Sequence, residues 1–157
     1  MSTKFTIFCT TAGTPEPLTV LLEAASRSVL RSLITRLRAC GYARITDPHL
    51  VLFGNLDCGA THAAQIAQRM QVSRQAISKT LRELQDLGFV RLEDDPDRRN
   101  QKLVVMTDMG LQLALDARDE LRKIEAAIAK DIGPNAMASL RSALEKTWGT
   151  SRDRLTA

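Results

Sequence analysis

The sequence THAAQIAQRMQVSRQAISKTLRELQDLGFVRLEDDPDRRNQKLVVMT, residues 61–107, decides the fold of this chain. Its first part predicts a short helix that Thr61 caps, because apolar residues recur at helical spacing from there to Met70. The dipeptide Gln71-Val72 then forms a tight turn, and Ser73 has a side chain that can cap a second helix. A helix, a tight turn and a second helix together predict a helix-turn-helix.

The second helix is predicted over Ser73–Leu87 and has two different faces. An apolar stripe runs along one face, and Gly88 then supplies the left-handed conformation that ends many helices. The other face carries polar and cationic side chains, which in a major-groove reader would contact DNA. The candidate DNA-binding residues of this helix are Ser73, Arg74, Gln75, Ser78, Lys79 and Arg82. The alternative is a solvated helix of a small bundle, in which a cationic outer face is ordinary.

A charged hairpin is predicted directly after this helix. Phe89–Glu93 alternates like a half-buried strand, and Lys102–Thr107 can return as its partner. The polar loop between these strands contains a proline and the two arginines Arg98 and Arg99. A hairpin that follows a recognition helix and carries arginines at its tip is the pattern of a winged helix.

The stretch Ser73–Gly110 resembles the MarR family of transcription regulators. The specific part is the wing pattern Asp95-Pro96-Asp97-x-Arg99, followed by a strand and by Thr107-x-x-Gly110. Family members usually carry a second arginine directly after the one that Arg99 matches, whereas this chain has Asn100 there and the pair Arg98-Arg99 instead. The resemblance implies a DNA-binding regulator whose N- and C-terminal helices interleave in a two-fold dimer.

The two wing arginines are expected to have different roles. By the match to the family, Arg99 is the residue that enters the minor groove beside the major-groove contact. Arg98 would face the opposite side, because alternate side chains of an extended segment point in opposite directions. Lys102, on the returning strand, should add a phosphate contact that carries no sequence information.

Long helices are predicted on both sides of this central region. Apolar residues recur at spacings of three and four over Leu18–Cys40, and Gly41 ends that helix. A helix of that length spans roughly 30–35 Å at 1.5 Å per residue, far more than a winged domain needs for its own core. Asp108–Ile132 and a last helix that ends at Gly149 also carry surplus apolar surface. We therefore expect a mainly helical homodimer.

A shorter helix is predicted over Pro48–Leu56, with Pro48 at its first position. The expected organisation is one compact domain in three parts. Residues 1–17 form an N-terminal arm, residues 18–46 and 108–157 a helical dimerisation region, and residues 47–107 the winged helix-turn-helix DNA-binding region.

Composition sets the class of protein. The 157 residues are 44% hydrophobic and only 4% aromatic, which favours a helical core, and the net charge of +4 favours a polyanionic partner. With no signal peptide and no long apolar run, we expect a cytoplasmic protein. Nucleophile elbows, phosphate loops, dinucleotide fingerprints and zinc-spaced clusters are absent from the sequence. We therefore expect neither an enzyme nor a metal or cofactor site.

The resemblance also implies an effector site, because family members commonly bind aromatic or phenolic ligands in the cleft between the dimer helices and the DNA reader. The cleft walls would come from the first helix, the Pro48–Leu56 helix and the start of the Asp108 helix. The candidate ligand-binding residues are Leu30, Ile34, His49 and Phe53. His49 has a second interpretation as a structural histidine.

Two other functions stay open. A winged domain can serve protein–protein assembly, although such a surface would tend to be apolar where this one carries arginines. Some family members instead sense oxidants through an N-terminal cysteine. The chain has three widely spaced cysteines, Cys9, Cys40 and Cys58, of which Cys9 is N-terminal.

Overall fold

The computed structural model describes residues 15–56, 61–96 and 102–149. Its helices are α1 (Leu18–Ala39), α2 (Asp47–Phe53), α3 (Ala63–Met70), α4 (Arg74–Asp86), α5 (Asp108–Ile132) and α6 (Pro134–Trp148). Its strands are β1 (Thr61–His62), β2 (Val90–Asp94) and β3 (Lys102–Met106), which form an antiparallel sheet in the order β1-β3-β2. The prediction of a mainly helical, winged helix-turn-helix fold is confirmed.

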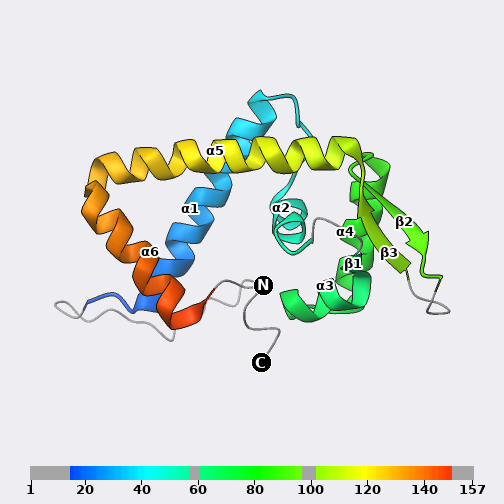
Figure 1. Ribbon diagram of the computed structural model, residues 1–157, viewed down its shortest axis with the longest axis horizontal. Coiled ribbons are helices and arrows are strands. Elements are labelled where there is room, and N and C mark those ends of the chain that lie inside the picture. Colours follow the sequence, from blue (N-terminus) through cyan, green and yellow to red (C-terminus); the bar gives the residue numbers. More distant parts are fainter. Residues whose placement is uncertain (1–14, 57–60, 97–101, 150–157) are drawn as a thin grey trace, which may run out of the picture.

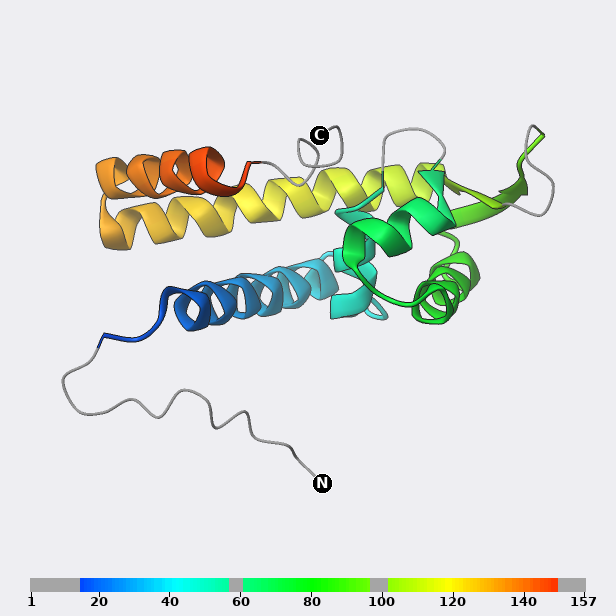
Figure 2. The same cartoon turned by 90° about the horizontal axis from the view of Figure 1, so that it is seen from below.

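The long helix α5 runs the length of the molecule and joins two parts (Figure 1). At one end α2, α3, α4 and the sheet form a unit that we call the winged lobe. At the other end α1 and α6 pack on α5, and we call these helices with the C-terminal half of α5 the arm. Figure 2 shows that α5 lies between α6 on one side and α1 on the other.

Most of the buried apolar side chains lie in the winged lobe and in the C-terminal half of α1. The stripe predicted on α4 is buried at Ile77, Leu81 and Leu84. The residues that share this core include Leu37, Leu52, Ile66, Val90, Val104 and Leu113. Because one continuous core joins α1, the helix-turn-helix and the start of α5, the lobe is held against the base of the arm.

Two local predictions at helix ends are wrong. Thr61 does not cap α3, because its backbone is extended in β1 opposite Val104 and its side chain is buried. His62 occupies the cap position instead, without a side-chain capping bond. The helix predicted to reach Leu56 ends at Phe53. Pairing with β3 overrides the local capping signal at Thr61, whereas α2 ends in a turn at Gly54, after which Asn55 and Leu56 donate to the carbonyls of Leu52 and Phe53.

The Thr107-x-x-Gly110 pattern closes the junction between the hairpin and α5. The Thr107 hydroxyl donates to the Gly88 carbonyl at 2.6 Å and accepts from the Gly110 N–H at 3.1 Å, which caps α5. The Thr107 N–H donates to the Phe89 carbonyl at 3.1 Å. A Cβ atom at Gly110 would lie 2.0 Å from that same carbonyl oxygen, so only glycine permits this approach. Gly88 itself has φ +80, as predicted for the helix stop.

Polar contacts fix the C-terminal end of α1 to α5. The Tyr42 hydroxyl donates to the Asp116 carboxylate at 2.5 Å. Burial, with a further contribution from this hydrogen bond, raises the pKa of Tyr42 to about 12, and the bond lowers the pKa of Asp116. Glu120 is buried and accepts from Lys123 at 2.5 Å and from Arg36 at 3.2 Å. The bond from Lys123 is the largest cause of the lowered pKa of Glu120, so this carboxylate stays charged between two cations.

We predict that Gly110→Ala destabilises the protein, because the added methyl group overlaps the Phe89 carbonyl and must displace backbone. The expected loss is about 1–3 kcal/mol in the free energy of unfolding, measured by denaturant titration. Gly54→Ala is the matched control, since its Cβ would meet the nearest atoms at 3.6 Å in a helical conformation. Equal stability of the two variants would contradict the steric role of Gly110.

Candidate nucleic-acid interface

The rotation of α4 about its axis decides which side chains face outward. Ser73 caps the helix by accepting from the Ala76 N–H at 3.2 Å, as predicted. Because Ile77, Leu81 and Leu84 are buried, the opposite face of α4 is turned to the surface. All six candidate residues of this helix are exposed, namely Ser73, Arg74, Gln75, Ser78, Lys79 and Arg82.

Hydrogen bonds along α4 organise part of this exposed face. The Ser78 hydroxyl donates to the Arg74 carbonyl at 2.8 Å, and Arg82 Nε donates to the Ser78 carbonyl at 3.1 Å. The Lys79 ammonium lies 3.9 Å from Glu83 on the same helix. The Arg82 guanidinium is thereby held along the helix, whereas Arg74 stands in the first turn, where major-groove readers present side chains to base edges.

A groove of about 250 Å³ separates α4 from the wing strand β3. It is lined by His62, Ala63, Ala64, Arg74, Ile77, Ser78 and Lys102. Three of the predicted DNA-binding residues therefore share one concave surface, although they come from elements that are distant in the sequence. Lys102 is also paired, at 2.6 Å, with Asp94 across the β2–β3 ladder.

His62 connects β1 to the base of the wing. His62 Nε2 lies 2.6 Å from an Asp95 carboxylate oxygen, and the two side chains are 20% and 6% exposed. This contact connects β1 with the residue that follows β2. No local signal could have shown it, because β1 is only two residues long and its pairing with β3 is a long-range contact.

The tip of the wing is not part of the described structure. Arg98 and Arg99, together with the loop 97–101, lie outside the described residues. Their expected roles in the minor groove therefore stay predictions.

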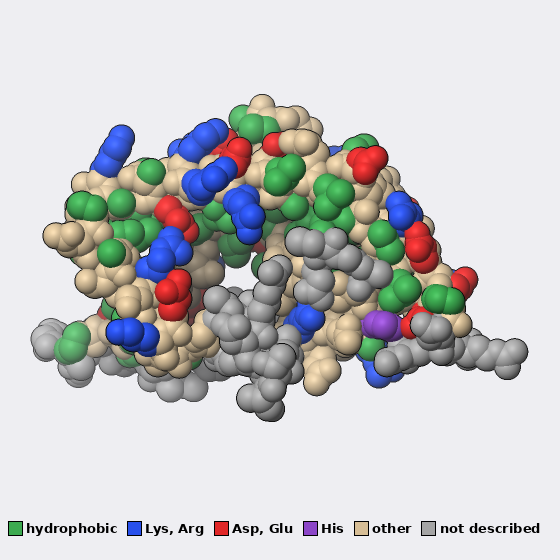
Figure 3. Space-filling model, in the orientation of Figure 1, with side chains coloured by type: hydrophobic (Ala, Val, Ile, Leu, Met, Phe, Trp, Pro, Cys, Tyr) green, Lys and Arg blue, Asp and Glu red, His purple; other side chains and the backbone are tan. Residues whose placement is uncertain are grey.

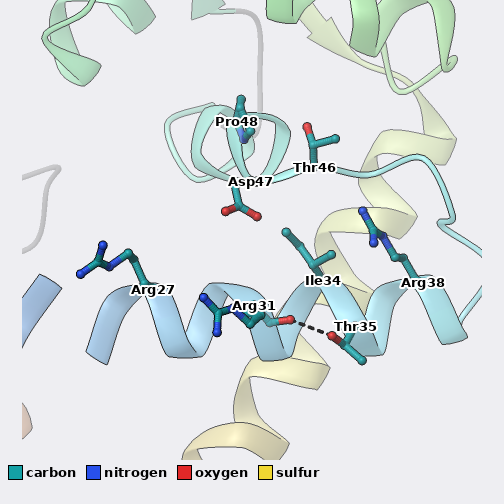
Figure 4. Close-up of a pocket in the computed structure, with 8 residues that line it drawn as sticks. All are labelled: Arg27, Arg31, Ile34, Thr35, Arg38, Thr46, Asp47 and Pro48. Carbon is teal, nitrogen blue, oxygen red and sulfur yellow. Dashed lines mark hydrogen bonds between the residues drawn. The ribbon is translucent and has the colours of Figure 1, made fainter. Parts of the chain in front are cut away.

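A second cavity, of about 490 Å³, lies between α1 and the start of α2. It is lined by Arg27, Arg31, Ile34, Thr35, Arg38, Thr46, Asp47 and Pro48. Figure 4 shows the three arginines on α1 and the Asp47 carboxylate pointing toward α1 from the start of α2. Three guanidinium groups and one carboxylate make this cavity cationic, and its volume is in the range of small-molecule sites.

The four candidate effector residues are not brought together in this cavity. Ile34 lines it. Leu30 and Phe53 pack against the hydrophobic core, and the Phe53 ring lies 6.3 Å from that of Phe89. His49 is buried within the lobe. The sequence alone did not point to Arg27, Arg31 and Arg38 as members of a site, because these residues are exposed on α1 and the position of α2 opposite them depends on the tertiary fold.

Within residues 15–56, 61–96 and 102–149, no cluster of three or more potential metal ligands occurs. No helix in the same ranges is long and apolar enough to cross a membrane. Of the three cysteines, Cys40 is exposed at the end of α1, and Cys9 and Cys58 lie outside the described residues.

Sequence comparison relates the winged lobe to known proteins. Residues 45–100 match the model of the MarR family. An uncharacterized protein of Mycobacterium tuberculosis is 26% identical over 82 residues, which are 52% of this chain and 57% of that protein. The chain thus matches little more than half the length of this relative.

Solved structures share the fold over most of the chain. The reduced form of MarR from Escherichia coli aligns with a TM-score of 0.74 and 19% identity, over 86% of this chain and 98% of that one. BpsR of Bordetella bronchiseptica, described with a mechanism for regulation of its DNA binding by 6-hydroxynicotinic acid, aligns with a TM-score of 0.64 and 18% identity, over 83% and 98% of the two chains. At these identities the likeness establishes the fold.

Proposed function

The chain belongs to the MarR family of winged helix-turn-helix transcription regulators, and from this premise we propose that it is a homodimeric, ligand-responsive repressor of a pseudo-palindromic operator. MarR-family proteins are DNA-binding regulators and not enzymes. The observation that carries the proposal is the outer face of α4, where six exposed polar and cationic residues stand opposite a buried apolar stripe. We place this activity in the cytoplasm.

The positions of the candidate residues support different roles for them in DNA binding. Arg74, in the first turn of α4, is the candidate for base recognition, because an arginine can donate two bonds to one guanine. Lys79, Arg82 and Lys102 suit phosphate contacts, which position the protein without reading sequence. Arg99, with Arg98 on the other side of the wing, would read the adjacent minor groove, which attracts arginine most where A·T pairs make it narrow.

Protein–protein assembly is the main alternative function. A surface for stable assembly usually has an apolar or aromatic centre. The exposed face of α4 instead presents arginine, lysine, glutamine and serine. Redox sensing is a second alternative, for which the exposed Cys40 is a candidate thiol. Neither alternative accounts for the cationic groove between α4 and β3 as directly as DNA does.

The dimer is supported by the apolar surface of the arm. Among the described residues α6 contains none that is buried, although it carries Leu140 and Trp148, which are 46% and 39% exposed. Leu18, at the start of α1, is 57% exposed. Figure 3 shows hydrophobic side chains on the surface over α5 and α6, and a hollow below α5 between the arm and the winged lobe. A second copy of the chain would cover this surface with the same surface of its own.

The effector proposal rests on the cationic cavity between α1 and α2. Arg27, Arg31 and Arg38 favour a ligand with a carboxylate or another anionic group. We therefore infer that the effector is an aromatic or phenolic acid, of the general kind named for BpsR. A ligand weakens DNA binding only if it binds better to the DNA-incompetent state than to the DNA-bound state.

We predict that Arg74→Ala lowers the discrimination between a fragment selected from the organism's own genome and unrelated DNA. The expected loss is about 1–3 kcal/mol, with the free energy of unfolding unchanged, because Arg74 is exposed. Binding titrations at several salt concentrations measure it. Arg118→Ala is the control, since Arg118 is exposed on α5 away from α4. Unchanged affinity and selectivity of Arg74→Ala would remove this residue from the interface.

We predict that Leu140→Glu gives a folded monomer that no longer binds two half-sites together, because a carboxylate would be buried in the arm of the dimer. Light scattering measures the mass. Val51→Glu introduces the same group at another exposed apolar position, on α2, and should stay dimeric. A wild-type chain that is monomeric at micromolar concentration would contradict the dimer.

We predict that aromatic acids, including 6-hydroxynicotinic acid, raise the melting temperature and weaken operator binding, whereas phenol has a smaller effect. Arg31→Ala should reduce the response to the acids, because it removes one guanidinium from the cavity. Thermal unfolding and DNA titration measure both. If no acid in such a panel changes either quantity, the anionic-effector proposal is wrong.

A further inference from the structure

His49 is a buried polar side chain that connects two helices of the winged lobe. His49 is 3% exposed and is the third residue of α2. The backbone N–H of Thr46 donates to its Nδ1 atom at 3.3 Å, as in the return bond of a capping box. Its Nε2 atom lies 3.0 Å from a carboxylate oxygen of Glu83 on α4. Both ring nitrogens therefore have a partner.

These two partners fix which nitrogen carries the proton. A backbone N–H can only donate, so Nδ1 must present its lone pair to Thr46. A carboxylate can only accept, so Nε2 must carry the proton that it donates to Glu83. The neutral Nε2-H imidazole satisfies both bonds at once. Protonation of Nδ1 would set two donors against each other, so the geometry selects this one tautomer.

The two ends of this hydrogen-bonded chain lie at the two candidate sites. Thr46, with Asp47 and Pro48, forms the α2 side of the cationic cavity between α1 and α2 (Figure 4). Glu83 lies on α4, the helix that we propose enters the major groove. The Lys79 ammonium on the same helix is 3.9 Å from the Glu83 carboxylate. One buried side chain thus joins the wall of the cationic cavity to α4.

We propose that His49 is a positioning residue that couples the cavity wall at Thr46 to the placement of α4 through Glu83, an inference that rests on the proposed function. Movement of the Thr46–Pro48 segment displaces the imidazole, because the Thr46 N–H bond ties the ring to the start of α2. The buried Nε2–H must then keep Glu83 as its acceptor or lose it at a cost, since an unpartnered buried donor is unfavourable. The position of α4 therefore depends on that of the cavity wall.

The free, full-length protein provides the first test. Nitrogen-15 spectra of the histidine rings should show His49 with Nε2 protonated and Nδ1 bare. Amide hydrogen exchange at Thr46 should become about three- to tenfold faster in Glu83→Ala, although Glu83 does not touch Thr46. Glu83→Gln retains an oxygen that accepts from Nε2 and should restore slow exchange. Asp86→Ala, which removes an exposed carboxylate from the same helix, should leave Thr46 unchanged.

DNA titration provides the second test. Glu83→Ala should weaken binding to the selected operator about three- to tenfold relative to Asp86→Ala, and Glu83→Gln should bind as tightly as the wild type. His49→Gln combined with Glu83→Ala should be no weaker than Glu83→Ala alone, because both changes break one chain of bonds.

The outcomes separate this inference from the proposed function. The opposite tautomer, or Thr46 exchange that Glu83→Ala does not change, overturns the coupling even if the protein binds DNA. Equal operator affinity of Glu83→Ala and Asp86→Ala also overturns it. A wild-type protein that selects no operator contradicts the proposed function, while the ring spectra and the exchange rates still decide whether His49 couples the two helices.

Discussion

The burial of Ile77, Leu81 and Leu84 is the constraint on which the rest of the interface depends. These side chains hold one face of α4 against the core that includes Ile66 and Val104. Because the apolar and polar faces lie on opposite sides of the helix axis, burial of the apolar stripe turns the polar face to solvent. The polar residues of α4 therefore lie together on its exposed face, and the groove beside β3 follows from the same packing.

The elements of the lobe could be predicted from the sequence because their signals are local. Ser73 caps the helix that follows it, and Gly88 takes the left-handed conformation that ends that helix. The contacts that organise the sites were not predictable in this way. Thr61 looked like a helix cap, yet it is buried in a strand by pairing with Val104. His62 meets Asp95 only after the three-stranded sheet has formed.

The candidate effector residues show the same limit. The periodicity of α1 correctly placed Ile34 on its inner side. It could not show that the short helix α2 begins opposite Arg27, Arg31 and Arg38 of α1. His49 was recognised as either a ligand or a structural residue. In the fold it is structural in its contacts, and it lies between the cavity wall and α4.

We propose that two copies of α4 read adjacent major grooves while the wings contact the flanking minor grooves. Hydroxyl-radical footprinting of the wild-type protein on its selected operator tests this claim most directly. We expect protected segments about one helical turn, ~10 base pairs, apart on one face of the duplex, with further protection at both outer flanks. A single protected segment, or uniform protection that does not depend on sequence, would contradict the account.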